Sequence, residues 1–292
     1  MKLGVVLPTF TVSHHEAIRV ALEAEEVGID GVFAYDHLWP IGHPELPSMS
    51  VFPLLGVVAA VTRRVMIGPL VARVTLYREA GGPAMPDSRP DMACEQVELL
   101  LAAFGSLAVI APGRVIAGIG AGDPANADED LAYGLPEPTF QERMSLLEAA
   151  AERLRVSGFP VWLGAGADAG RSGRYLELAG RLGAAVNIWG DSWIDGGVNV
   201  RPGTGGSAAC GIGGPAESPR RPEEGGGSLD RGRWHTGATR GPVEFTWAGH
   251  PEGRDIPALR RLIDRLREGG FSWAVVAGVS ALDVAAAASP PA

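Results

Sequence analysis

The 292-residue sequence has only two cysteines, Cys94 and Cys210, and Lys2 is the single lysine among its 25 basic residues. The cysteines lie far apart and belong to no CxxC or Cys/His pattern, so a structural zinc site is not expected. Positive charge is also scarce, because 34 acidic residues outnumber the bases and give a net charge of −9. A nucleic-acid or anionic-membrane surface needs a basic field, so neither partner is expected.

Long hydrophobic runs are missing as well. The longest apolar stretches, 51–61 and 99–112, fall short of the roughly 20 residues that cross a bilayer. The apolar run near the N-terminus is too short for a signal peptide, and no small-residue cleavage site follows it. The composition, 46% hydrophobic and 20% charged, is that of a globular chain. We therefore expect a cytoplasmic protein that does not enter the membrane.

Short apolar runs alternate with amphipathic segments along most of the chain. The runs are typical of buried parallel strands, and they occupy 3–7, 31–35, 65–74, 114–119, 161–164, 185–189, 243–247 and 273–277. The segments between them predict helices, the first of which begins with a capping-box pattern at Ser13 and Glu16. Repeated β/α units at this length predict one (β/α)8 barrel domain over residues 1–292. An open parallel sheet is the alternative that the same pattern allows.

Two segments interrupt this alternation, at about 77–90 and 191–241. The second stands where a sixth helix should cover the barrel, and its Gly-rich part, 203–227, has too little apolar surface to order itself. We interpret it as a lid, a disordered insertion or a corrupted reading frame.

Several candidate functional side chains follow predicted strands, where the active sites of such barrels lie. His37 follows the second strand, and histidine is the residue type that exchanges protons most readily near neutral pH, so His37 is the candidate proton donor or acceptor, with a solvated loop histidine as the alternative. Its neighbour Asp36 is expected to point the opposite way. Phe10, Trp39, His43 and Trp247 predict an aromatic, mostly apolar pocket for a small-molecule substrate, with a simple loop role as the alternative for His43.

Glycine clusters follow the fourth and fifth strands, at 118–122 and 164–166. Glycine lets a planar cofactor approach the backbone, because it has no Cβ. A glycine turn before a helix can also offer backbone N–H groups to a phosphate. Neither cluster fits a Rossmann fingerprint, and the sequence has no P-loop and no GxSxG elbow.

Eight motifs in register resemble the bacterial luciferase-like family of flavin- and deazaflavin-dependent oxidoreductases. They are KLGVVLPTF, DGVFAYDHLW, RRVMIGPLVARVT, PGRVIAGIGAGD, AYGLP, PVWLGAGA, LELAGRLGAAVNIWG and VEFTWAG. The resemblance covers residues 1–74 and 104–190 well and 242–279 loosely.

The resemblance implies a (β/α)8 barrel whose cofactor lies across the carboxyl-terminal mouth, with His37 as the active-site histidine. The other cofactor-binding positions that it implies fall into three groups. They are a non-proline cis-peptide bulge behind the ring at Leu70 and Val71, a loop beside the ring at Gly120, Gly122 and Asp123, and a phosphate-binding turn at Gly164, Ala165 and Gly166.

The resemblance also implies the chemistry. PGRVIAGIGAGD followed by AYGLP is more similar to the branch that uses coenzyme F420, which implies hydride transfer to or from a small organic substrate. Arg73, Arg171 and Arg174 are the candidates for binding the acidic tail of that cofactor.

Two alternatives stay open. One is an FMN-dependent monooxygenase that uses reduced flavin and oxygen. The other is a degenerate, non-catalytic barrel, because a missing sixth helix would leave apolar strand residues that a homodimer could cover.

Overall fold

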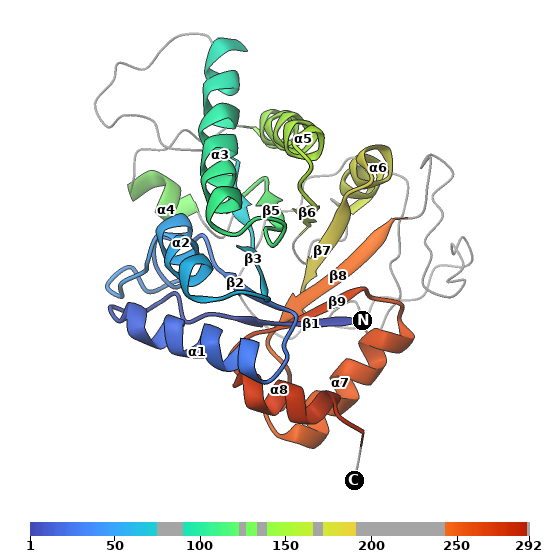
Figure 1. The fold of residues 1–292 in the computed structure, drawn as a ribbon. Coiled ribbons are helices and arrows are strands. Elements are labelled where there is room, and N and C mark those ends of the chain that lie inside the picture. Colours follow the sequence, from blue (N-terminus) through green and yellow to red (C-terminus); the bar gives the residue numbers. More distant parts are fainter. Residues whose placement is uncertain (75–89, 123–126, 133–138, 166–171, 191–242, 291–292) are drawn as a thin grey trace, which may run out of the picture.

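The computed structural model describes residues 1–74, 90–122, 127–132, 139–165, 172–190 and 243–290 (Figure 1). Its nine strands are β1 (Lys2–Val6), β2 (Gly31–Ala34), β3 (Met66–Pro69), β4 (Ala72–Arg73), β5 (Ala117–Gly120), β6 (Val161–Gly164), β7 (Ala185–Trp189), β8 (Glu244–Gly249) and β9 (Trp273–Val276). The helices are α1 (His14–Glu26), α2 (Val51–Val61), α3 (Pro90–Ile110), α4 (Ala127–Ala132), α5 (Phe140–Val156), α6 (Ser172–Leu182), α7 (Ile256–Glu268) and α8 (Ala281–Ala288).

The strands form one parallel sheet in the order β3-β2-β1-β9-β8-β7-β6-β5-β4. β3 and β4 are the two halves of the predicted third strand, separated by a cis peptide bond between Leu70 and Val71. β3 pairs with β2 and β4 pairs with β5. The ring closes where the Ile67 N–H donates to Arg114 O and Ile67 O accepts from the Ile116 N–H, both at 2.8 Å. The predicted (β/α)8 barrel is therefore confirmed, and the open sheet is wrong.

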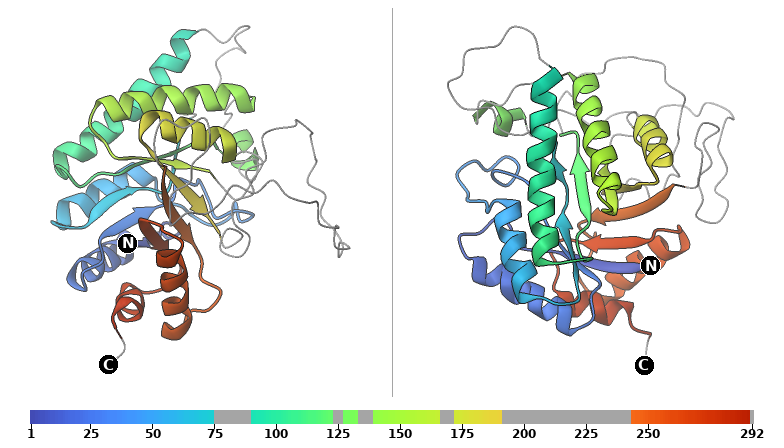
Figure 2. Two further views of the ribbon diagram at one scale, coloured as in Figure 1. Left: turned by 90° about the vertical axis from the view of Figure 1, so that its right-hand side faces the viewer. Right: turned by 45° about the horizontal axis from the view of Figure 1, so that its top comes forward.

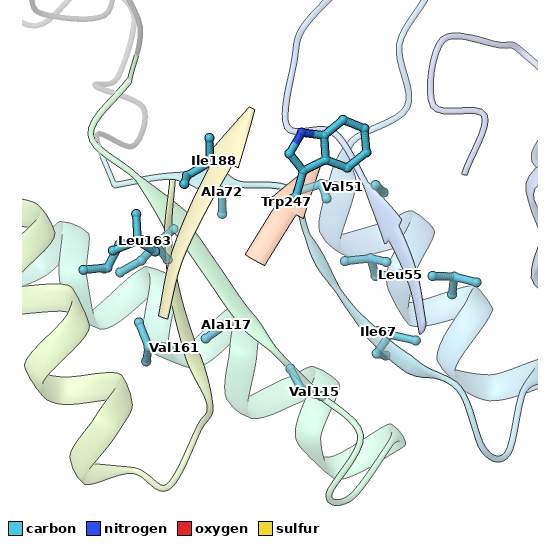
Figure 3. Close-up of a cluster of buried hydrophobic side chains, with 14 of the residues drawn as sticks. Val51, Leu55, Ile67, Ala72, Val115, Ala117, Val161, Leu163, Ile188 and Trp247 are labelled. Carbon is cyan, nitrogen blue, oxygen red and sulfur yellow. The ribbon is translucent and has the colours of Figure 1, made fainter. Parts of the chain in front are cut away.

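Most of the helices lie outside the ring of strands (Figures 1 and 2). A large apolar core fills the space between the two layers, and Figure 3 shows part of it, including Ile67, Leu163 and Ile188. No helix among the described residues is long and apolar enough to cross a membrane. The predicted insertions at 77–90 and 191–241 lie almost entirely outside the described residues, so they stay predictions.

A second, smaller core lies inside the barrel. Phe33 of β2 stacks on Trp162 of β6 with ring centroids 5.1 Å apart, and both rings contact Trp273 of β9. Since β2 and β6 are not neighbours in the sheet, these contacts must cross the barrel interior. Gly4 makes room for them, because a Cβ there would lie 2.8 Å from Phe33. The aromatic cluster therefore fills the interior, as in other barrels of this type.

The helix starts depart from prediction in two places. Ser13 stands at the N-cap of α1, but its side chain makes no capping hydrogen bond, so the predicted capping box is wrong. The Ser13 N–H instead donates to Thr11 Oγ1 at 3.0 Å, within the loop before the helix. A complete capping box occurs at α5, between Thr139 and Glu142.

Candidate active site

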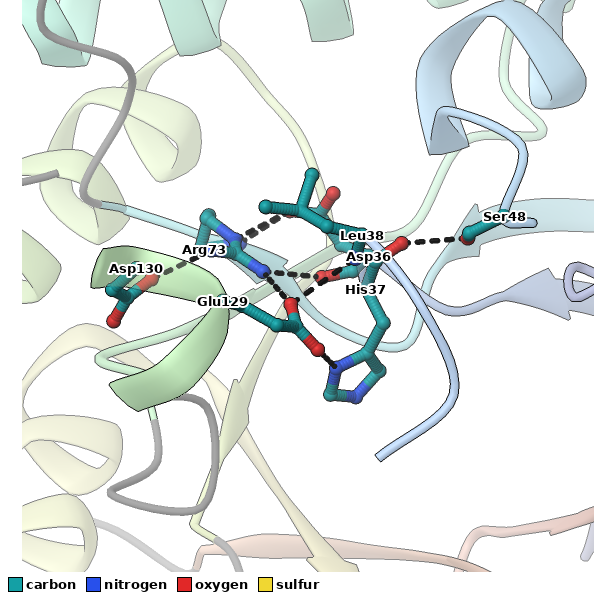
Figure 4. A network of polar contacts seen from close by, with 7 residues as sticks. All are labelled: Asp36, His37, Leu38, Ser48, Arg73, Glu129 and Asp130. Atoms are coloured by element: carbon teal, nitrogen blue, oxygen red, sulfur yellow. Dashed lines mark hydrogen bonds and ion pairs between the residues drawn. The ribbon is translucent and has the colours of Figure 1, made fainter. Parts of the chain in front are cut away.

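Polar and aromatic side chains gather at the carboxyl ends of β1, β2, β4 and β7. His37 lies in the loop that follows β2, as predicted, and its side chain is 21% exposed. His37 Nδ1 lies 3.0 Å from Glu129 Oε1 of α4, a carboxylate that is only 2% exposed. Figure 4 shows the imidazole directed at this carboxylate. Sequence reasoning missed Glu129, which is 92 residues from His37.

Three donors share the Glu129 carboxylate. Its second oxygen accepts the Leu38 N–H at 3.1 Å and the Arg73 guanidinium at 2.8 Å. Burial opposes the charged form, but the hydrogen bonds from His37, Leu38 and Arg73 outweigh it and hold the pKa of Glu129 below its usual value. Glu129 is therefore an anion that only accepts hydrogen bonds, so the proton of a neutral His37 lies on Nδ1. Nε2, which has no hydrogen-bond partner in the described part of the chain, is then the free base.

Arg73 on β4 organises the rest of the network. Its guanidinium also contacts Asp130 Oδ1 at 2.8 Å and the main-chain oxygen of Asp36 at 3.1 Å. Its own N–H donates to the Asp36 carboxylate at 2.9 Å. Burial disfavours the charged guanidinium, yet the carboxylates of Asp36, Glu129 and Asp130 raise the pKa of Arg73. The expectation that Arg73 binds an acidic cofactor tail is wrong, because acidic side chains of the protein already surround it.

Asp36 faces Arg73 and not the His37 ring, in agreement with its expected direction. Burial raises the pKa of Asp36, although the Arg73 main-chain N–H and guanidinium act in the opposite direction. The network therefore has one firmly anionic group, Glu129, directly against the histidine. Among the residues in the described ranges, no group of three His, Cys, Asp or Glu side chains is arranged to hold a metal ion.

An aromatic wall stands beside the histidine. Phe10 stacks on Tyr35 with ring centroids 5.6 Å apart and ring planes 16° apart. The centroids of these two rings lie 6.2 and 6.1 Å from the centroid of the His37 ring. Trp189, at the end of β7, meets Tyr35 edge-on at 5.7 Å. The predicted pocket residue Phe10 is thus brought to His37, and Trp39 lies half-buried in the loop after it. Tyr35 and Trp189 were missed, although both end predicted strands.

The structure does not bring Trp247 to this mouth. Its side chain is fully buried in the core between strands and helices (Figure 3), and its indole N–H donates to Gly190 O at 2.9 Å. In the sheet it pairs with Ile188, whose side chain belongs to that same outer core. Trp247 therefore belongs to core packing and not to the predicted substrate pocket.

The glycines at the strand ends make room for Val71. The peptide bond between Leu70 and Val71 is cis, where the family resemblance places such a bulge. A Cβ on Gly120 or on Gly164 would lie 2.6 Å from Val71 Cγ2. The closeness of Val71 thus explains both glycines without a cofactor, which differs from the predicted reason.

The remaining cofactor-binding predictions have different outcomes. Gly122 is exposed and has a φ of +81°, a left-handed backbone that favours glycine. The Ala165 N–H donates to Asn187 O at 2.9 Å, so it does not face a phosphate. Asp123, Gly166 and Arg171 lie outside the described residues.

Two arginines stand near this edge of the barrel. The Arg143 side chain of α5 approaches Gly122, where a Cβ would lie 4.0 Å from Arg143 Cδ. Its Nε is buried and has no partner among the described residues. Arg174 of α6 lies over the Phe140 ring at 5.8 Å. Arg143 was missed, because sequence alone does not show that the start of α5 adjoins the Gly122 turn.

Comparison with known proteins agrees with this architecture. Residues 1–79 match the family model of the luciferase-like monooxygenases. An F420-dependent glucose-6-phosphate dehydrogenase from Beutenbergia cavernae is 30% identical over 167 residues, which are 54% of this chain and 44% of that protein. The enzyme of the same name from Kineococcus radiotolerans is 33% identical over 136 residues, 46% of this chain and 34% of that protein. The matched part is thus less than half the length of either relative.

A solved structure shows the same fold. It is an F420-dependent secondary alcohol dehydrogenase in complex with an F420–acetone adduct, with a TM-score of 0.64 and 12% sequence identity, covering 98% of this chain and 97% of that chain. Fold and site together define a parallel (β/α)8 barrel with a histidine–carboxylate pair at its carboxyl-terminal mouth. Within that class, residues 1–79 are similar to the luciferase-like monooxygenases, and about half of the chain is similar to F420-dependent dehydrogenases.

Proposed function

We propose that the protein is a coenzyme F420-dependent oxidoreductase, which transfers a hydride between the deazaflavin and a small organic substrate. The observation that carries the proposal is His37 at the barrel mouth, held by an anionic Glu129 through Nδ1, with no partner for Nε2 among the described residues. The relatives that are 30% and 33% identical support the choice of cofactor, since both are named as F420-dependent dehydrogenases.

The residues at the mouth fit such a cofactor. The Leu70–Val71 bulge would back the ring, and Val71 is only half-buried. The unpartnered Nε of Arg143 beside the Gly122 turn suits the anionic part of the cofactor. Arg174 remains a candidate for the acidic tail, whereas Arg73 does not. When bound, coenzyme F420 supplies or accepts a hydride at carbon five and does not usefully activate oxygen.

The protein's own groups would move the accompanying proton. His37 Nε2 accepts a proton from a substrate hydroxyl, or donates one to a carbonyl oxygen in the reverse direction. Glu129 fixes the proton on Nδ1 and stabilises the imidazolium that forms, as the buried aspartate does in a Ser-His-Asp triad. Arg73 keeps Glu129 ionised. The rings of Phe10, Tyr35 and Trp189 limit the access of water to this proton transfer.

Fluorescence titration of the purified protein with coenzyme F420 tests the proposal. We expect saturable binding at micromolar concentration, followed by F420 reduction with glucose 6-phosphate or 2-propanol as the first substrates tried. Absence of F420 binding, with tight binding of FMN instead, would contradict the proposal and favour a flavin monooxygenase.

We also propose that a second copy of the chain covers an apolar face on α2 and α3. Large apolar side chains are exposed there, namely Val57, Val61, Leu99, Val109 and Ile110, and Val109 is 84% exposed. Light scattering after size exclusion should give the mass of a homodimer.

We further propose that the protein works in the cytoplasm. Cys94 and Cys210 belong to no pairing pattern, which suits a reducing compartment. Fractionation of the source cells tests this location.

A further inference from the structure

One buried polar atom at the mouth is not used by the His37 network. Tyr35 Oη is buried and has no hydrogen-bond partner among the described residues. Phe10 stacks on one side of the Tyr35 ring, and Trp189 meets it edge-on at 71°. Tyr35 follows β2 and Trp189 ends β7, so their contact spans strands that are not neighbours in the sheet. The phenol is thus fixed across the top of the barrel interior, beside the ring of His37.

The state of this hydroxyl is defined by its surroundings. Burial raises the pKa of Tyr35, so the phenol is neutral at physiological pH and can donate a hydrogen bond. A buried hydroxyl without a partner is unfavourable, and such groups are rare in folded proteins. Phenylalanine would fill the same space without this cost. The hydroxyl is therefore best explained by a partner that arrives with a ligand.

We propose that Tyr35 is a specificity-determining residue, whose hydroxyl donates a hydrogen bond to an oxygen atom of the ligand bound beside His37. The inference rests on the proposed function for the identity of that ligand. The chemistry required is an acceptor oxygen within hydrogen-bond reach of Tyr35 Oη, beside the His37 ring, whose centroid lies 6.1 Å from that of Tyr35. Either a carbonyl of the deazaflavin ring or an oxygen of the substrate would supply it.

The Tyr35→Phe variant tests this assignment, because it keeps the ring and its stacking and removes only the hydroxyl. The ligand-free variant should be at least as stable as the parent, since an unsatisfied polar group is lost. If the acceptor belongs to the cofactor, the Kd for F420 should rise about 3- to 10-fold. If it belongs to the substrate, the Kd for F420 stays unchanged and the KM for the substrate rises by a similar factor.

Tyr175→Phe is the matched control. Tyr175 is a buried tyrosine of α6 that packs in the outer core, so its change should leave both Kd and KM unaltered. A lower Tm of ligand-free Tyr35→Phe would mean that the hydroxyl already has a partner in the protein, which overturns the inference. Unchanged Kd and KM in this variant would overturn it as well.

The two proposals can fail separately. If the parent binds FMN and not F420, the proposed function fails, whereas the same titrations with FMN still test Tyr35. If the parent binds neither cofactor, both fail.

Discussion

His37 derives its chemistry from residues that are distant in sequence. Glu129 touches its Nδ1, Arg73 holds Glu129, and the Ser48 hydroxyl donates to the main-chain oxygen of His37 at 2.6 Å. Glu129 fixes the tautomer of the imidazole, Arg73 holds the carboxylate that pairs with it, and Ser48 restrains the main chain of His37. The ring is therefore oriented before any ligand binds, which is what general acid–base catalysis requires.

Replacing His37 by Asn or Ala should slow turnover about 10²- to 10⁴-fold and leave the Kd for F420 nearly unchanged. His43→Ala is the control, since His43 is exposed and its partner among the described residues is Glu45, also exposed. Steady-state kinetics and fluorescence titration measure the two effects. Wild-type turnover in the His37 variants would show that His37 is only a loop residue.

Glu129 makes the stability of the folded protein depend on pH. Its folded pKa lies below the ordinary 4.5, so its stabilisation is present above pH 4.5 and is lost as the pH falls through the lower folded pKa. Glu129→Gln should therefore cost about 1–3 kcal/mol near neutral pH, and the difference from the parent should shrink below about pH 4.5. Thermal melts across this range measure it, with exposed Glu177→Gln as the control. A difference that does not change with pH would argue against an ionised Glu129.

Among the elements, the split third strand shapes the mouth. The break at Leu70–Val71 turns the Val71 side chain toward Gly120 and Gly164, while Ala72 and Arg73 continue the barrel as β4. The same break therefore positions Arg73 for the His37 network and Val71 for the strand ends opposite. This short segment therefore contributes both to the packing of the strand ends and to the geometry of the site.

Gly120→Ala should destabilise the protein by about 1–3 kcal/mol, because its Cβ would lie 2.6 Å from Val71 Cγ2. Val71→Ala in the same chain should restore part of the loss, since it removes that methyl group. Gly105→Ala in α3 is the control, as its Cβ would meet nothing within 4 Å, and it should be neutral or stabilising. Chemical denaturation of the parent, Gly120→Ala, the Gly120→Ala/Val71→Ala double variant and Gly105→Ala measures these differences in the free energy of unfolding. Equal stability of Gly120→Ala and the parent would contradict this reason for the glycine.

The elements differ in how far sequence could predict them. The strands were found because buried parallel strands are continuous apolar runs, and His37 was found because it follows one. α4 was not predicted, because its six residues, ADEDLA, show no helical periodicity of apolar residues. Trp247 was misplaced because an apolar run does not reveal which side chains face the interior of a barrel. The neighbours of Arg73 could not be predicted, since they lie up to 57 residues away.

On the scale of the whole molecule, the two ends of the barrel have different roles, one in the candidate active site and one in stability. The histidine network occupies the carboxyl ends of the strands, whereas Arg114 lies before β5 at the opposite end. Its guanidinium donates to the main-chain oxygens of Ala59, Thr62 and Val65 and to Thr62 Oγ1, at 2.9–3.1 Å. It thus joins the end of α2 to the strands, a stabilising role typical of this end of a barrel.

Arg114→Ala should therefore lower the free energy of unfolding by about 1–3 kcal/mol and leave kcat and KM unchanged at temperatures where the protein is folded. Arg267→Ala is the control, because in the described part of the chain this exposed arginine pairs with Asp264 of its own helix. A change in KM for Arg114→Ala with unaltered stability would contradict this division of tasks.

The central claim is that a deazaflavin binds across this mouth and that His37 exchanges a proton with the substrate bound beside it. A crystal structure of the protein in complex with coenzyme F420 tests it most directly. The account predicts a ring packed against Leu70–Val71, with His37 Nε2 on the side where the substrate meets carbon five. A ring bound elsewhere, or an imidazole that has left Glu129 and turned away from the ring, would contradict it.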